Sequence, residues 1–374
     1  MRTALTGIRH PAATERILLL AGAVLLLAAL LAFDPPQSRL SVARDVLGGF
    51  FPILAWPAAL SAAVFSLSMV WRVVLWVLYR PVATPRADAS GLPSLTVLVP
   101  AYNEGPAAGA CVRSILASAY PGDRLRVVAI DDGSTDDTAF HLFAAAAVAP
   151  GRVEVVRMER NGGKRAALRE GFRRVDTDIV VTVDSDTELP PDSLRALVAP
   201  LAVDSRVGAV AGRIEVLNRD AGLLTRMLGV RYRLGFDFTR AYQSVIGSVF
   251  VCPGAFTAYR FSAIRDGLDE WLGQRFLGNR CTNGDDHALT NRVLAAGWRT
   301  VYQSTADALT RVPSTYRGLS KMYVRWARSS VREGLLYLAL APRLLGRLRA
   351  WPAYADALAS YLQIPLRIYL MFAG

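Results

Sequence analysis

Cysteine and histidine are scarce in this chain of 374 residues. Its three cysteines, Cys111, Cys252 and Cys281, are odd in number and far apart, so their spacing indicates neither a disulfide framework nor a zinc site. The three histidines are equally scattered. We therefore expect small, buried cysteine side chains in a protein of a reducing compartment.

Acidic residues are outnumbered by basic ones, 31 to 43, which leaves a net charge of +12. No nucleic-acid recognition motif and no alternation of basic with aromatic residues accompanies this excess, so we do not expect a nucleic-acid partner. The excess suits an anionic membrane leaflet and polyanionic ligands. Because 52% of the residues are hydrophobic and 20% are charged, we expect a folded soluble domain with membrane segments attached.

Two long apolar runs lie near the N-terminus. Residues 17–33 are uninterrupted, and residues 50–79 contain one arginine, Arg72. A membrane-spanning helix needs roughly 17 to 25 apolar residues, so we expect two transmembrane helices within a membrane segment over residues 1–81. A secretory signal is the alternative for the first run, but no small-residue cleavage site follows it. The arginines before that run predict a cytoplasmic N-terminus and, after two spans, a cytoplasmic domain in a multi-pass inner or plasma membrane protein.

A basic stretch interleaved with apolar residues covers residues 316–349, and a further apolar stretch follows it. Arg325, Arg328 and Arg332 recur at helical spacing, which is typical of an interfacial helix in the lipid headgroups. A solvated helix face gives the same pattern. We expect residues 336–374 to hold an interfacial helix and the start of a C-terminal transmembrane segment, in a truncated or minimal form.

Strand-like and helix-like patterns alternate between residue 94 and about residue 335, which we expect to be the cytosolic domain. The expected strands are 95–99, 127–130, 153–156, 179–183 and 207–210, and the expected helices are 108–119, 136–148, 164–175 and 191–201. Alternation at this spacing favours an α/β fold with a mainly parallel sheet, whose ligands bind beyond the carboxyl ends of the strands.

Four charged signatures follow these elements in sequence order: Asp131-Asp132, Asp184-Ser185-Asp186, Gly284-Asp285-Asp286 and Arg325-Trp326. Turns and helix starts also favour acidic residues for structural reasons. Two carboxylates at positions i and i+2, however, can meet one hard cation, Mg²⁺ or Mn²⁺, that bridges phosphate oxygens. A carboxylate of the third signature can take the proton of an acceptor hydroxyl. Together the signatures predict metal-dependent sugar transfer from a nucleotide diphosphate, with Asp184 and Asp186 on the metal.

The glycine-rich segment over residues 161–165 opens a predicted helix with two cations, Lys164 and Arg165. Exposed amides at a helix start and cationic side chains both suit phosphate groups. We therefore expect Lys164, Arg165 and Arg325 to contact the nucleotide sugar together with Asp184, and Trp326 to offer the acceptor sugar an aromatic platform.

The loop at residues 100–104, Pro-Ala-Tyr-Asn-Glu, resembles the first motif of the inverting family 2 glycosyltransferases, and the resemblance covers residues 94 to about 335. It implies a GT-A (Rossmann-like) fold and makes the last acidic residue of the third signature, Asp286, the catalytic base beside Asp285. It also assigns five residues of the first two motifs to the nucleotide sugar, with the two aspartates facing the uridine: Ala101, Tyr102, Glu104, Asp131 and Asp132.

Residues 252–260 and 276–292 are similar to hyaluronan synthases and chitooligosaccharide synthases, which are processive membrane enzymes that extend a β-linked polymer from UDP-sugars. The resemblance implies that Cys252, Pro253 and Gly254 lie along the acceptor path. The chain departs from the processive signature at Met322, where those enzymes carry glutamine. Alginate-type synthases, which use GDP-linked donors, share this departure.

We therefore expect a membrane-integrated, inverting hexosyltransferase that passes sugar from a UDP-sugar to a growing β-linked extracellular polysaccharide. Three alternatives stay open: a non-processive transferase acting on a lipid carrier, an alginate-type synthase using a GDP-sugar, and a membrane-tethered nucleotide-binding pseudoenzyme. The sequence leaves open the identity of the sugar, and whether further copies of the chain or separate secretion subunits assemble with it.

Overall fold

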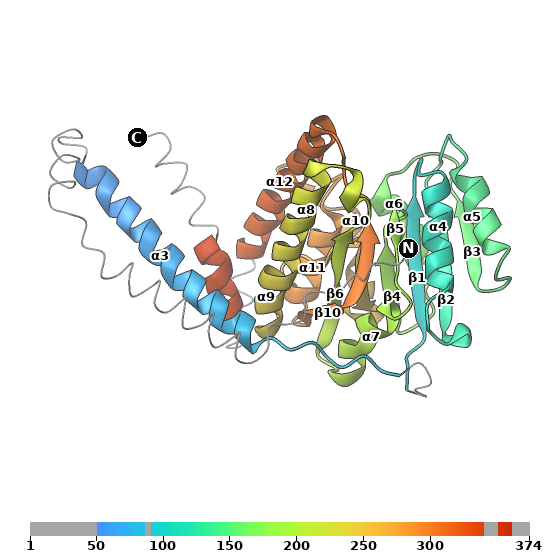
Figure 1. Ribbon diagram of the computed structural model, residues 1–374, viewed down its shortest axis with the longest axis horizontal. Helices are drawn as coiled ribbons and strands as arrows, with labels where there is room; N and C mark the ends of the chain where they lie inside the picture. The colour runs from blue at the N-terminus through green and yellow to red at the C-terminus, as the bar shows by residue number, and fades with distance from the viewer. Residues whose placement is uncertain (1–50, 87–90, 340–350, 361–374) are drawn as a thin grey trace. The chain divides into compact units, whose positions relative to one another are not determined.

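A computed structural model describes residues 51–86, 91–339 and 351–360 (Figure 1). The chain divides into two compact units, one of residues 1–79 with 348–374 and one of residues 80–347. The predicted span at 17–33 and most of the predicted C-terminal segment lie outside the described residues. Within the described ranges, no helix combines the length and the apolarity of a membrane span.

The first unit contains helix α3, Phe51–Leu78, over the second apolar run, and a helical segment at residues 351–360. One ion pair joins these two segments: Arg72 Nε lies 2.8 Å from Asp356 Oδ1, and Asp356 is buried. Arg72 also donates to Ser360 Oγ at 2.6 Å. The charged residues that interrupt the two apolar stretches therefore neutralise each other, as a buried charge requires.

The second unit is built on an eight-stranded sheet in the order β3-β2-β1-β4-β7-β6-β10-β5 (Figure 1). Strands β1 to β4 run parallel, as do β6 and β10, whereas β7 is antiparallel to both β4 and β6, and β5 is antiparallel to β10. The strands are β1 Leu95–Ala101, β2 Leu125–Asp131, β3 Val153–Arg157, β4 Ile179–Val183, β5 Thr187–Glu188, β6 Val207–Val216, β7 Phe256–Arg260 and β10 Arg299–Thr310. A separate two-stranded sheet pairs β8, Arg275–Phe276, with β9, Asn279–Arg280.

The helices of this unit follow the predicted α/β alternation in its first half. They are α4 Pro106–Leu116, α5 Thr138–Ala146, α6 Lys164–Phe172, α7 Ser193–Val203, α8 Leu223–Leu234, the π-helical turn η4 Gly235–Arg240, α9 Ala241–Val245, α10 Leu268–Leu272, α11 Asp285–Ala295 and α12 Tyr316–Ala339. The five predicted strands and four predicted helices all occur, with ends shifted by a few residues except at 179–183, where the bounds coincide.

The sheet is mainly parallel, as expected, because β1 to β4, β6 and β10 run in one direction, but it is mixed, because β7 and β5 run against them. Strand β7 comes from the segment Phe256–Arg260, which follows the predicted acceptor segment, and it is inserted antiparallel between β4 and β6. Strands β1 and β4 are fully buried and apolar, as strands covered on both faces must be. They form the rigid base from which the loops at their carboxyl ends project.

Candidate active site

The carboxyl ends of β1, β2 and β4 and the starts of α6 and α11 border a cavity of about 1810 Å³ in the second unit. Helices α8 and α12 and the turn η4 line its other side. A cavity of this size exceeds the few hundred to about 1,000 Å³ that a typical small-molecule site occupies. It therefore has room for a nucleotide sugar together with part of a second substrate.

The two aspartates after β2 have different positions. Asp132 lines the cavity, and its Oδ1 accepts the backbone N–H of Gly162 at 2.7 Å. Burial raises the pKa of Asp132 against the opposing effect of that hydrogen bond. Asp131 is fully buried, accepts the N–H of Ser134 at 2.9 Å and lies 3.4 Å from Arg157 Nε. Asp131 therefore shapes the turn, whereas Asp132 faces the ligand space.

The loop after β1 is held against this turn. The N–H of Asn103 donates to Ser134 Oγ at 3.0 Å, and the N–H of Glu104 donates to Thr138 Oγ1 at 2.9 Å. Ala101, Tyr102 and Glu104 all line the cavity. Partial desolvation, followed by the nearby carboxylates of Asp186 and Asp184, raises the pKa of Glu104 to about 7. This wall of the cavity therefore disfavours a further negative charge on Glu104.

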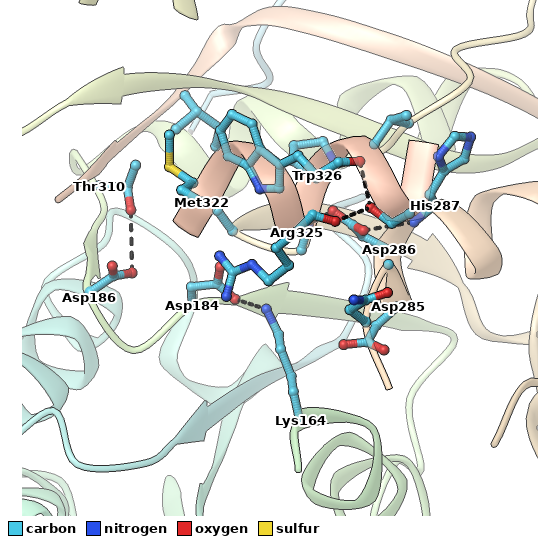
Figure 2. A pocket seen from close by; sticks show the side chains of 18 of the residues that line it. Lys164, Asp184, Asp186, Asp285, Asp286, His287, Thr310, Met322, Arg325 and Trp326 are labelled. Atoms are coloured by element: carbon cyan, nitrogen blue, oxygen red, sulfur yellow. Dashed lines mark hydrogen bonds and ion pairs between the residues drawn. The ribbon is translucent and has the colours of Figure 1, made fainter. Parts of the chain in front are cut away.

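The two carboxylates after β4 both line the cavity (Figure 2). Asp184 forms an ion pair with Lys164, the first residue of α6, and Asp186 Oδ1 accepts the hydroxyl of Thr310 at 3.3 Å. Burial and the charge of Asp184 raise the pKa of Asp186. Two partly desolvated carboxylates two residues apart are hard oxygen donors and lack a full complement of positive charge, so they fit a divalent cation.

Within the parts of the chain that the structure describes, no group of three or more histidine, cysteine, aspartate or glutamate side chains is arranged to hold a metal alone. Mg²⁺-type sites often use one or two carboxylates and take their remaining ligands from substrate phosphates and water. Asp184 and Asp186 suit such a shared site.

The two aspartates at the start of α11, Asp285 and Asp286, have different partners. Asp285 pairs with the buried guanidinium of Arg165, which donates to the carbonyl of Trp271 at 2.8 Å as well. Burial raises the pKa of Asp285, opposed by its hydrogen bond with Arg165. Arg165 is not among the residues that line the cavity, so the structure directs it to Asp285 and not to the expected nucleotide position.

Asp286 faces the cavity from the first turn of α11 (Figure 2). Its Oδ1 accepts the N–H of His287 at 2.8 Å, and its Oδ2 accepts the N–H of Gly254 at 3.3 Å. A Cβ atom added to Gly254 would lie 3.0 Å from Lys164 Nζ, 3.7 Å from Asp286 Cβ and 3.8 Å from Asp184 Oδ1. Gly254 therefore lies close to Lys164, Asp184 and Asp286 at once.

One residue of the expected acceptor segment, Cys252, points into the protein core and not into the cavity. Cys252 is fully buried, its N–H donates to Thr290 Oγ1 at 3.1 Å, and burial raises the pKa of its thiol to about 12. Pro253 and Gly254 line the cavity, whereas Cys252 does not. The segment thus presents main chain, not a thiol, to the ligand space.

Helix α12 contributes Arg325 and Trp326. Arg325 reaches from the helix toward Asp184 and Lys164, while Trp326 lies beside Met322 (Figure 2). Trp326 packs on an apolar cluster of Val216, Leu228, Val312 and Met322, and its ring centroid lies 6.1 Å from that of Tyr232.

Sequence reasoning did not identify the aromatic and cationic residues of α8 and η4 that line the same side. Tyr232, Phe236 and Arg240 face the cavity, and the guanidinium of Arg240 lies 3.9 Å from the centroid of the Phe236 ring. Single π-helical turns within helices are frequently found at functional sites. Their only signal in the sequence was a local concentration of aromatic and basic residues over 231–240, which matches no motif.

Comparisons with known proteins identify the family. Residues 96–268 match the profile of glycosyl transferase family 2. An N-acetylglucosaminyltransferase of Azorhizobium caulinodans is 37% identical over 289 residues, which are 76% of this chain and 72% of that protein. A hyaluronan synthase of Streptococcus pyogenes is 36% identical over 273 residues, 72% of this chain and 63% of that protein.

A solved structure extends the likeness to the fold. The mannosyltransferase PcManGT from Pyrobaculum calidifontis, in complex with GDP-Man and Mn²⁺, superposes with a TM-score of 0.59 at 25% identity and covers 85% of this chain and 90% of its own. The α/β domain described above is therefore GT-A-like. With its acidic loops around one cavity and relatives of this similarity, the chain belongs to the family 2 glycosyltransferases and has hexosyl transfer as its reaction class.

Proposed function

We propose that the protein is a membrane-integrated, inverting transferase that adds sugar from a UDP-sugar to the growing end of a β-linked extracellular polysaccharide. One observation supports this proposal most directly. The carboxylate of the candidate base, Asp286, and the Lys164–Asp184 ion pair of the candidate metal and diphosphate site both lie beside Gly254. A base and a leaving-group site on opposite sides of a narrow gap suit displacement at one carbon atom.

Asp286 is the proposed general base. Among the described residues, its Oδ2 accepts one hydrogen bond, from the N–H of Gly254 at 3.3 Å, so it has remaining acceptor capacity toward the cavity. In the proposed reaction, Asp286 takes the proton of the acceptor hydroxyl while the oxygen attacks the anomeric carbon from the face opposite the leaving diphosphate. The bond to the diphosphate breaks as the glycosidic bond forms, which inverts the configuration.

Asp184 and Asp186 would hold Mg²⁺ or Mn²⁺, which when bound neutralises charge on the leaving diphosphate. Lys164 and Arg325 face the same region and add cationic donors for phosphate oxygens. Asp132 and the loop at Ala101 and Tyr102 form the nucleotide end of the cavity. Trp326, with Tyr232 beside it, provides an aromatic surface for the acceptor sugar.

Two donors are supported by different relatives. A UDP-sugar is proposed from the resemblance of residues 252–260 and 276–292 to hyaluronan and chitooligosaccharide synthases, and relatives named N-acetylglucosaminyltransferase and hyaluronan synthase support that resemblance. The mannosyltransferase with GDP-Man and Mn²⁺ covers most of this chain and favours a GDP-sugar as the second candidate. The chain spans 72% of the Azorhizobium caulinodans relative and 59% of the Neorhizobium galegae one, so polymer synthesis is a proposal for the whole protein.

Membrane integration in a multi-pass arrangement with the catalytic domain in the cytoplasm is proposed from the apolar runs of the sequence and from two exposed helix faces. Leu223, Met227, Val230 and Leu234 recur at helical spacing on α8 and are exposed, and the last three also line the cavity. On α12, Val331 and Leu335 are exposed beside the arginines of that helix. Apolar side chains flanked by cations suit an anionic lipid surface.

The test uses the full-length chain in detergent with Mn²⁺ or Mg²⁺. We would supply UDP-N-acetylglucosamine, UDP-glucose, UDP-glucuronate, GDP-mannose and GDP-mannuronate, singly and in pairs, and measure the size of the product. We expect a polymer from one or two UDP-sugars. A polymer from a GDP-sugar would instead support the second candidate, and a single sugar on lipid would support a lipid-carrier transferase.

The variant Asp286→Asn is expected to lower kcat by about 10²- to 10⁴-fold, because the transition state loses its proton acceptor. Binding of UDP with Mn²⁺ should stay within about threefold of the unaltered protein, since Asp286 does not contact the diphosphate in the proposed reaction. The matched control is Asp266→Asn, because Asp266 is exposed and does not line the cavity. Wild-type turnover in Asp286→Asn would refute the proposed base.

A further inference from the structure

A buried carboxylate on α12 connects three separate parts of the second unit. Glu333 is 1% exposed, and it accepts hydrogen bonds from Arg332 Nε at 2.8 Å, Gln274 Nε2 at 3.0 Å and Asn291 Nδ2 at 3.3 Å. A carboxylate withdrawn from water to this degree is tolerated only with such donors around it. Glu333 therefore fixes α12 to α11 and to the segment that follows α10.

Arg332, one of the donors to Glu333, also contacts the loop that carries the proposed base. Arg332 donates to Asn283 Oδ1 at 3.0 Å and also to the carbonyl of Asn283. From the opposite side, Arg165 donates to that carbonyl at 3.4 Å and pairs with Asp285. Because Asn283 lies three residues before Asp286, the loop is held from two helices immediately before the base.

Helix α12 is in direct contact with this loop. A Cβ atom added to Gly284 would lie 2.5 Å from Ser329 Cβ, so the main chain of the loop packs on the helix without space for a side chain. Ser329 also donates to the carbonyl of Arg325, one turn earlier. One stretch of helix thus joins the cavity residues Arg325 and Trp326 to the contacts made by Arg332 and Glu333.

We propose, on the basis of the function proposed above, that Glu333 and Arg332 are positioning residues for glycosyl transfer. Neither residue lines the cavity, so neither touches the substrates. Their contacts keep the loop bearing Asp286 in register with the helix bearing Arg325. The position of the base relative to the diphosphate-binding side chains is thereby fixed. A displacement of about 1 Å between reacting groups can reduce a rate about 10²-fold.

The negative charge of Glu333 is part of this arrangement. Gln274 and Asn291 both turn their amide NH₂ groups toward it. Their amide oxygens, Gln274 Oε1 and Asn291 Oδ1, are buried and have no hydrogen-bond partner within the described residues. An amide whose two ends are similar in shape turns its donor end toward an anion. A neutral group at position 333 removes the reason for that orientation.

The first test is Glu333→Gln in the full-length chain. We expect kcat for transfer to fall about 10- to 100-fold, because the base loop loses its fixed position. The donor KM should stay within about threefold, because Lys164, Asp184 and Asp186 do not contact Glu333. Hydrogen exchange at the amides of residues 281–286 should become faster in the variant with Mn²⁺ and UDP bound. The optimum of the pH profile should stay in place, since the base itself is unchanged.

A second variant tests the same contacts in case Glu333→Gln does not fold. Asn283→Ala removes one acceptor of Arg332 from a half-buried loop and leaves Glu333 and its donors in place. We expect faster exchange at 281–286 and a kcat reduced about 3- to 10-fold.

The matched control is Glu154→Gln on β3, where Glu154 pairs with Arg126 and Arg174 away from the cavity. It also loses ion pairs, but its kcat and its exchange at 281–286 should stay within twofold of the unaltered protein.

Unchanged kcat and unchanged exchange at 281–286 in both Glu333→Gln and Asn283→Ala would overturn the proposal. So would a loss of activity that only follows the loss of folded protein, with exchange at 281–286 unaltered. If the unaltered chain transfers no sugar to any acceptor, the proposed function fails, whereas the exchange measurement still decides whether Glu333 fixes the loop.

Discussion

Two adjacent carboxylates at the start of α11 have opposite environments. Both line the cavity, but Asp285 is paired with the buried Arg165, whereas Asp286 accepts two backbone N–H groups. Because the Asp285–Arg165 pair is buried, it anchors the first turn of the helix to α6. The neighbouring Asp286 is therefore held by backbone contacts on a fixed turn, with its proton-accepting capacity directed at the substrates.

Gly284, directly before these aspartates, should not tolerate a side chain. Its φ is +72°, and an added Cβ atom would lie 2.5 Å from Ser329 Cβ and 2.9 Å from a guanidinium nitrogen of Arg332. Gly284→Ala is expected to lower the free energy of unfolding by about 2–4 kcal/mol, from left-handed strain and the clash with α12. The thermal midpoint of unfolding measures it.

Gly151→Ala is the matched control. Gly151 has a φ of +82°, but an added Cβ atom would have nothing within 4 Å. Only the backbone strain remains, so we expect a loss of about 1 kcal/mol. Equal losses in the two variants would show that the contact of the loop with α12 contributes nothing.

The loops that the sequence singled out border one cavity, but the sequence did not predict the direction of every side chain. Lys164, Asp184 and Asp286 surround one cavity, whereas Arg165, Asp131 and Cys252 point elsewhere. Each of these three residues, which do not line the cavity, is next in sequence to a residue that does. Successive residues turn by about 100° on a helix and alternate on a strand, so neighbours must differ. A motif locates the segment, and only the packing decides which member faces the ligand.

At the scale of elements, the prediction was strongest where the pattern is local. Strands β1, β2, β3, β4 and β6 are short β-branched runs and were expected. The antiparallel insertion of β7 was not, because its pairing with β4 and β6 joins residues far apart in the chain. Strand β10 was not predicted either, because its register shift between Gln303 and Asp307 breaks the alternation of buried and exposed residues.

Helix α12 explains the methionine at position 322. Met322 is 8% exposed within the apolar cluster of Val216, Leu228 and Val312, which joins α12 to β6 and α8. Met322→Gln would bury an amide among apolar side chains. We expect the free energy of unfolding to fall by about 1–3 kcal/mol, with no lengthening of the product. The checks are the thermal midpoint and product size.

The comparison variant is Val203→Gln on α7, where Val203 is 70% exposed and does not line the cavity. Its amide stays in water, so the thermal midpoint should hardly change. A longer polymer from Met322→Gln would instead mean that glutamine at this position governs processivity in this chain, whatever its packing.

At the scale of the whole molecule, the distribution of charge is uneven. The chain carries a net charge of +12, yet the carboxylates of Asp132, Asp184, Asp186 and Asp286 face the cavity. The same cavity is also lined by cationic side chains, among them Arg240, Lys321 and Arg325. Its acidic wall is the part around Asp184 and Asp186, where Asp184 is already paired with Lys164. If the donor is a nucleotide diphosphate sugar, as proposed, a divalent cation would be needed to bring its diphosphate against these two carboxylates.

This balance predicts that metal and nucleotide stabilise the protein together. Across the described part of the chain, no group of three ligand side chains is arranged to hold a metal alone, so Mn²⁺ by itself should shift the thermal midpoint little. Mn²⁺ with UDP, at about 100 times the dissociation constant, should add about 2.7 kcal/mol. Scans with Mn²⁺, with UDP, and with both measure the two effects.

Asp184→Asn and the replacement of UDP by UMP should each abolish the joint shift, for different reasons. The variant removes a carboxylate that would hold the cation, and UMP lacks the second phosphate that would complete its coordination. A large shift with Mn²⁺ alone would contradict the prediction, because it would require a complete protein site. An equal shift with UDP and chelator would also contradict it, because Lys164 and Arg325 would then balance the diphosphate without a metal. The joint shift is thus the test of whether the acidic wall binds the donor only through a cation.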